Sequence, residues 1–176
     1  MTQRTEIVFD GRIIRSLDGR LLLTAPPDTD LVLGGFDPGG GRFVCGLSRY
    51  EAGNSVVVVS YADGTVQHEL RLPFGWYIDG KEPPKWCLDG RGLVIAVLGD
   101  PDSKGAVPMD SQSFYLWTLD DGRLRRLLGQ GHSYHSKFAV EGNSLRYVPR
   151  PDETATVPID LSGKEVPLRG RDEQRK

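Results

Sequence analysis

The chain has 176 residues, of which 38% are hydrophobic and 26% charged, and its 22 basic residues are balanced by 24 acidic ones. This length suits one domain with its own core, and the balanced charge argues against a general nucleic-acid binder, which needs a positively charged face. The longest apolar runs, 56–59 and 93–98, are far shorter than the roughly 20 residues of a spanning helix, so we expect no membrane segment.

The N-terminus and the cysteines indicate a compartment. No basic stretch followed by an apolar run opens the chain, so we expect no secretory signal and a cytoplasmic location. Cys45 and Cys87 occupy comparable places in two apolar segments. We interpret them as reduced thiols of the core, with a disulfide as the less favoured alternative.

Asp-Gly dipeptides divide the chain into a succession of predicted β-hairpins. They begin at Asp10, Asp18, Asp63, Asp79, Asp89 and Asp121. A two-residue hairpin turn needs positive φ, which glycine accepts without strain and aspartate tolerates. The first two dipeptides divide residues 6–25 into a three-strand meander, and a short strand at 31–33 is expected to complete this N-terminal unit.

Three longer units follow, with a period of about 50 residues. Each opens with an aromatic residue, a tight glycine turn and an apolar strand, at 36–44, 86–94 and 138–147. Each closes with a strand pair around a second glycine turn, beginning at Ser55, Ser113 and Thr154. We expect the opening aromatics Trp86 and Phe138 to be buried anchors. Glycine and proline interrupt every helical pattern, and β-branched and aromatic residues dominate the apolar runs, which predicts an all-β chain.

The fold predicted from these units is a small or incomplete β-propeller of antiparallel blades, with three clear repeats plus the N-terminal meander. One domain is expected over 1–168, followed by a solvated, disordered tail at 169–176. Within the repeats, the segments 86–96 (WCLDGRGLVIA) and 115–122 (YLWTLDDG) resemble the WD40-like repeat of TolB-type β-propellers. The resemblance spans most of 36–168 and implies the fold, but its motifs are structural and carry no catalytic residues to this chain.

The repeat count raises the question of closure. Closed propellers have about four to eight blades, and an open array exposes strand edges. Either residues 6–33 form a fourth blade that closes the ring, or two chains complete a ring together, or the chain belongs to something longer. We favour self-association, because the N-terminal segment is shorter than the full repeats.

Candidate chemical sites are weak. His132 and His135 lack a third metal ligand nearby, and the loop that contains Asp100 and Asp102 has Lys104 where calcium needs an oxygen. The sequence contains no nucleophile elbow and no phosphate-binding loop. We therefore predict no catalytic residue, no metal site and no cofactor.

Candidate partner-binding residues lie in two places. The connection 72–85 holds Phe74, Trp76, Tyr77 and Ile78 among prolines, so it is stiff and apolar enough either to present a contact surface or to pack between blades. The second place is a basic cluster with Arg123 and Arg125, which can dock an acidic partner or keep an outer strand from aggregating.

These observations favour a non-enzymatic protein-interaction or scaffold module that self-associates as a homo-oligomer and has one further, unidentified protein partner. The alternative is a propeller-type enzyme or small-ligand binder with its site over the central channel. A structural fragment of a larger assembly is the third interpretation. Nucleic acid and membrane are not among the expected partners.

Overall fold

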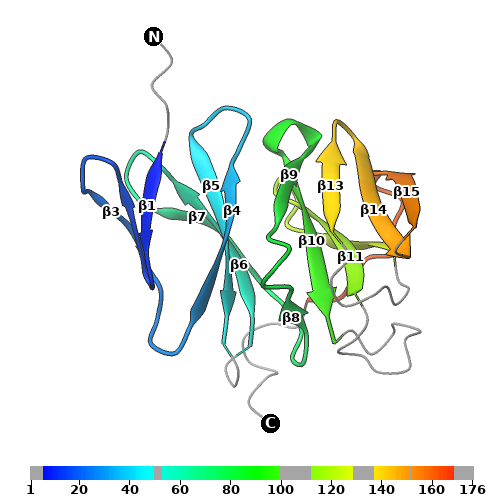
Figure 1. The fold of residues 1–176 in the computed structure, drawn as a ribbon, viewed down its shortest axis with the longest axis horizontal. Coiled ribbons are helices and arrows are strands. Elements are labelled where there is room, and N and C mark those ends of the chain that lie inside the picture. Colours follow the sequence, from blue (N-terminus) through cyan, green and yellow to red (C-terminus); the bar gives the residue numbers. More distant parts are fainter. Residues whose placement is uncertain (1–5, 50–52, 100–111, 129–136, 151, 169–176) are drawn as a thin grey trace.

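The computed structural model describes residues 6–49, 53–99, 112–128, 137–150 and 152–168, which form an all-β fold of several antiparallel sheets (Figure 1). The helical content of these residues is a single 3-10 turn, Leu88–Gly90. Within the same described ranges, no helix combines the length and the apolar character that crossing a membrane requires. The prediction of an all-β chain is confirmed.

The first two sheets are meanders of consecutive strands. The first has the order β1-β2-β3 and the second the order β4-β5-β6-β7. Their bounds are β1 Ile7–Asp10, β2 Ile13–Ser16, β3 Leu21–Thr24, β4 Asp30–Phe36, β5 Arg42–Ser48, β6 Ser55–Ser60 and β7 Val66–Arg71. The glycine turns predicted at Gly11, Gly19 and Gly64 have positive φ, as tight hairpins require.

One boundary predicted from the sequence is wrong. Residues 31–33 belong to β4 and pair with β5 of the second sheet, so they do not complete the N-terminal unit. The aromatic opening at Phe36 is the last residue of β4, and the glycine turn that follows joins β4 to β5. The hydrophobic pattern located the strand but did not show which neighbour it pairs with.

The third and fourth sheets follow the same plan. Their strands are β8 Tyr77–Ile78, β9 Lys85–Cys87, β10 Gly92–Leu98, β11 Gln112–Thr118, β12 Leu124–Leu128, β13 Phe138–Glu141, β14 Ser144–Arg150 and β15 Glu153–Pro158. The third sheet has the order β12-β11-β10, and β10 pairs at its other edge with both β8 and β9. The fourth sheet has the order β13-β14-β15.

The end of the last repeat departs from the prediction. The strand after the second glycine turn was expected to pair with β15, but it crosses to the third sheet. There Glu165 pairs with Arg125 of β12, the Arg126 amide donates to the Lys164 carbonyl oxygen at 2.8 Å, and the Val166 amide donates to the Leu124 carbonyl oxygen at 2.8 Å. The C-terminal segment 163–166 therefore covers the edge of β12.

The four sheets lie in a row in chain order, each facing the next, with β1–β3 at one end and β13–β15 at the other (Figure 1). An apolar cluster fills each interface. The first cluster joins Ile14 and Leu22 to Phe43, Cys45, Val57 and Val59. The second joins residues of the second and third sheets, and the third joins β10 and β11 to Phe138, Leu145, Tyr147 and Ile159.

Strands of the second and third sheets face two interfaces at once, which explains their continuous apolar runs. On β10, Leu93 and Ile95 point into the second cluster while Val94 points into the third. On β5, Phe43 faces the first sheet while Val44 faces the third. Successive side chains of a strand point to opposite faces, so a strand between two sheets is apolar throughout.

The opening aromatics have different surroundings. Phe138 is 4% exposed and packs edge-on against Phe114, with ring centroids 5.1 Å apart, so its prediction as a buried anchor is confirmed. Trp86 is only partly buried and lies at the margin of the second cluster. Its indole Nε1 donates to the Gly35 carbonyl oxygen at 3.1 Å, and the Arg42 guanidinium lies 5.1 Å from its ring centroid.

The row is open in the single chain. The first and fourth sheets lie at opposite ends of the molecule, so the N-terminal unit does not meet the last repeat (Figure 1). Of the closure routes expected from the sequence, closure within one chain is not formed by the residues that the structure describes. The tail predicted at 169–176 lies outside the described residues.

Candidate functional site

The connection between the second and third sheets forms a tight loop. The Trp76 amide donates to the Pro73 carbonyl oxygen at 3.1 Å, which closes a turn around Phe74 and Gly75. Gly75 has φ of 86°, a conformation that side-chain-bearing residues avoid. Proline at one corner and glycine at the other therefore fix the direction of the chain through this turn.

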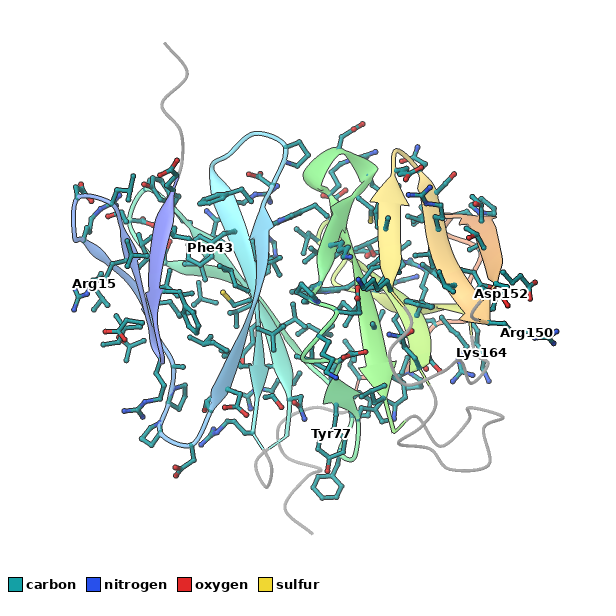
Figure 2. The ribbon with its side chains drawn as sticks, viewed as in Figure 1. Arg15, Phe43, Tyr77, Arg150, Asp152 and Lys164 are labelled. Atoms are coloured by element: carbon teal, nitrogen blue, oxygen red, sulfur yellow. The ribbon has the colours of Figure 1, made fainter. Side chains whose placement is uncertain are left out.

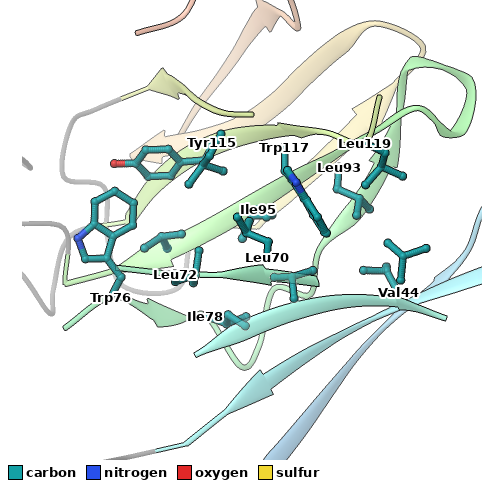
Figure 3. Close-up of a cluster of buried hydrophobic side chains, with 14 residues drawn as sticks. Val44, Leu70, Leu72, Trp76, Ile78, Leu93, Ile95, Tyr115, Trp117 and Leu119 are labelled. Carbon is teal, nitrogen blue, oxygen red and sulfur yellow. The ribbon is translucent and has the colours of Figure 1, made fainter. Parts of the chain in front are cut away.

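Buried side chains hold the loop from the protein side. Trp76 is 6% exposed and belongs to the second cluster, where its ring centroid lies 4.8 Å from that of Tyr115 (Figure 3). The side-chain amide of Asn54 donates to the Trp76 carbonyl oxygen at 3.0 Å. Ile78 pairs with Val97 on β10 and is also buried in the cluster.

Phe74 points the other way. Its side chain is 83% exposed, more than any other large hydrophobic side chain among the described residues. Tyr77 is half-buried and lies at the end of the third sheet (Figure 2). The loop thus presents one aromatic ring on a backbone that its neighbours immobilise.

Two of the four loop candidates are corrected by this geometry. Trp76 and Ile78 were candidates for partner contact, but both are core residues. For these two residues the alternative, packing between neighbouring units, is correct. Sequence reasoning grouped four apolar residues and lacked the signal that separates them. That signal is the glycine turn, which reverses the chain between Phe74 and Trp76.

The basic cluster is used within the chain. Arg125 is 8% exposed, its guanidinium donates to Thr118 Oγ1 at 2.8 Å, and it pairs with Asp121 at 2.8 Å. Arg123 pairs with Glu165 of the C-terminal segment at 3.4 Å. Arg125 is therefore not available to a partner, and the acidic group that Arg123 meets belongs to this chain.

These bonds affect Asp121. Hydrogen bonds from Arg125, Thr118 and the Arg123 amide hold the pKa of the Asp121 carboxyl well below its ordinary value of 3.8. A carboxyl whose pKa is lowered by folding stabilises the folded state above its unfolded pKa, and this contribution disappears as the pH falls through the folded pKa.

We therefore expect Asp121→Asn to lower the free energy of unfolding at neutral pH. The difference from the wild type should shrink as the pH falls below 3.8, the ordinary aspartate value. Urea unfolding at a series of pH values measures it. Asp120→Asn, in the same turn, is the matched control and should leave stability almost unchanged. A pH-independent loss for Asp121→Asn would show that its charge does not contribute.

Two buried carboxylates, those of Asp79 and Glu82, lie in the connection between β8 and β9. Asp79 Oδ2 accepts from the Gln112 side-chain amide at 3.0 Å, and Asp79 Oδ1 accepts from the Lys81 backbone amide at 3.0 Å. Glu82 Oε2 accepts from Lys85 Nζ at 3.2 Å and from the Phe138 amide at 3.4 Å. Both carboxylates are almost fully buried and shape the β8–β9 connection, so their contacts are structural.

One hollow of about 420 Å³ lies beside the edge of β7. It is lined by Gln67, His68, Glu69, Leu70 and Arg71 and by Trp117, Gly122 and Leu168. His68 contacts Trp117 edge-on there, with ring centroids 6.5 Å apart. Five of its eight lining residues belong to the single strand β7.

Metal and thiol chemistry find little support in the described part of the chain. His132, His135, Asp100 and Asp102 lie outside the described residues, and within those residues no group of three His, Cys, Asp or Glu side chains is placed to hold a metal. Cys45 and Cys87 are buried, as predicted, and burial raises the pKa of each thiol to about 12. They are therefore poor nucleophiles.

Comparison with known proteins adds no relative. No protein-family model matches the chain, and no curated protein matches it either. The geometry indicates one candidate site, the loop at residues 73–78 that exposes Phe74.

Proposed function

We propose that this chain is a non-enzymatic protein-interaction module built from propeller-type blades, and that the loop at 73–78 is its partner-binding surface. The observation that carries the proposal is the exposed Phe74 ring on a loop whose flanking residues are buried. An ordered loop loses little conformational entropy when a partner binds, so a single aromatic anchor on it can contribute much of the binding energy.

The arrangement of the sheets supports the propeller interpretation. Consecutive strands form each sheet, and apolar clusters fill the three successive interfaces. Blades of propellers and other repeat arrays bury their faces against neighbours in this way. A likeness to WD40-like repeats of the TolB type, suggested by residues 86–96 and 115–122, remains part of the proposal.

The alternative, a ligand or catalytic site over a central channel, has less support. Such a site needs carboxylates or histidines that converge on open space. The buried carboxylates of the described residues are Asp79 and Glu82, and both accept hydrogen bonds from neighbouring groups. The interaction module is therefore the first interpretation. A cytoplasmic location belongs to the same proposal.

Phe74→Ala tests the proposal. Proteins that co-purify with the tagged wild-type chain from its native cells are identified by quantitative mass spectrometry, and each is then tested for direct binding as a purified protein. We expect Phe74→Ala to weaken the direct complex by about 2 kcal/mol, the size of an interface hot spot. The melting temperature of the free chain should stay within a degree or so, because the ring makes few contacts.

Leu161→Ala is the matched control, because Leu161 is also exposed but lies far along the chain, after β15. It should leave the complex intact. Equal losses from Phe74→Ala and Leu161→Ala, or a complex that survives Phe74→Ala, would refute the loop as the binding surface.

A further inference from the structure

The outer face of the first sheet is apolar at its centre. Val8 is 48% exposed and Leu21 is 50% exposed on this face, whereas the exposed Phe9 pairs with Ile14 and shares the inward face. The exposed Leu17 lies in the turn between β2 and β3. Ile14 and Ser16 face the second sheet, so their neighbours Ile13 and Arg15 face outward. Residues paired across strands share a face, which adds Val8, Asp10, Leu21 and Thr24 to this outer face.

The opposite end of the row is polar. On the fourth sheet, Phe138 and Leu145 face inward, and the outer face carries the paired rows Ala139–Arg146–Thr156 and Glu141–Ser144–Pro158. Arg146 and Glu141 form an ion pair at 2.7 Å across this face. Arrays of stacked units end in such polar faces, because the terminal face meets water. The C-terminal end of the row is therefore capped, and the N-terminal end is not.

We infer that the outer face of the first sheet binds a second copy of this chain through a two-fold axis. A contact between the apolar first sheet and the polar outer face of the fourth sheet, which ring closure requires, would leave Arg146 and Glu141 desolvated. A contact between two first sheets matches apolar surface with apolar surface. It also leaves a polar face at each free end of the dimer.

The charges on this face fit the two-fold contact. Asp10 and Arg15 occupy one diagonal of the β1–β2 pair, and Val8 and Ile13 occupy the other. An axis in the plane of the interface, running along the Val8–Ile13 diagonal, places each Val8 and Ile13 near its own copy. The same axis places Arg15 of each chain opposite Asp10 of the other chain, giving two symmetric ion pairs.

Arg15 is already directed outward. It projects from the end of the row, away from the other sheets (Figure 2). Its Nη1 donates to the Gly19 carbonyl oxygen in the turn after β2, at 3.2 Å. This surface lies on a different sheet from Phe74, so the inference does not depend on the proposed function.

Charge reversal tests the contact. We expect the wild type to sediment as a dimer at micromolar concentrations. Asp10→Arg makes the face wholly basic and Arg15→Asp makes it wholly acidic, so each variant alone should dimerise roughly a hundredfold more weakly. An equimolar mixture of the two variants should form a heterodimer of about wild-type affinity, and the double variant should dimerise again.

Matched controls lie at the other end of the row. Arg146→Asp and Glu141→Arg reverse charges on the outer face of the fourth sheet and should leave the dimer unchanged. Thermal melts of each chain, followed by circular dichroism, confirm that the substituted proteins are folded. A wild type that stays monomeric, a mixture that fails to associate, or a fourth-sheet variant that dissociates the dimer overturns the inference. Dimer formation in Phe74→Ala separates this result from the proposed function.

Discussion

Trp76→Ala should lower the free energy of unfolding by about 3 to 5 kcal/mol, the usual cost of removing a large buried aromatic side chain. The indole is almost fully buried and packs against Tyr115, which is itself completely buried (Figure 3). Truncation leaves a cavity between the second and third sheets, and the hydrogen bond from Asn54 to the Trp76 carbonyl loses its rigid support. Urea or thermal unfolding at neutral pH measures the change.

Phe74→Ala is the matched control, since it removes an aromatic ring two positions away on the same loop. It should leave the free energy of unfolding nearly unchanged. The pair of variants therefore separates the two roles of the loop, with stability assigned to Trp76 and recognition to Phe74. A loss below about 1 kcal/mol for Trp76→Ala would contradict its place in the core.

Phe138→Ala should also cost about 3 to 5 kcal/mol, because Phe138 is buried in the interface between the third and fourth sheets. Its ring packs against Phe114, and Lys85 Nζ lies 4.2 Å from its ring centroid. The substitution removes both contacts. Differential scanning calorimetry of the purified chain gives the loss of stability.

Trp86→Ala is the comparison for Phe138→Ala. The two residues occupy equivalent places in the repeats, but Trp86 is half-buried, its indole Nε1 donates to the Gly35 carbonyl oxygen, and the Arg42 guanidinium lies over its ring. We expect a smaller loss for Trp86→Ala than for Phe138→Ala. A larger loss for Trp86→Ala than for Phe138→Ala would contradict the smaller contribution expected from the partial burial of Trp86.

The sequence predicted the strands better than their assignment to sheets. Asp-Gly turns and continuous apolar runs located the hairpins, because a turn needs positive φ and a strand between two sheets is apolar on both faces. The pairing of residues 31–33 with β5 was missed, since a strand before a proline-rich loop and a strand after it have the same pattern. The crossing of 163–166 to β12 was missed because it depends on a contact between distant segments.

The candidate site was predicted in part. Proline, glycine and aromatic residues identified the loop at 73–78, but composition alone does not show which aromatic faces the core. The loop is oriented by the turn at Gly75, by the packing of the Trp76 ring on Tyr115, and by the hydrogen bond from Asn54 to the Trp76 carbonyl oxygen. For Arg123 and Arg125, local charge predicted an acidic contact, and the acidic groups proved to be Glu165 and Asp121 of the same chain.

The C-terminal segment has a consequence for synthesis. A ribosome releases β12 well before residues 163–166, so the nascent third sheet emerges with one strand edge unpaired. Unpaired edges are templates for strands of other chains, and domains begin to fold from the N-terminus while synthesis continues. The Arg125–Glu165 pairing and the packing of Val166 close that edge only after residues 163–166 have also emerged from the ribosome. Premature termination between β12 and Gly163 therefore yields a product that has all strands of the third sheet and still lacks their cover.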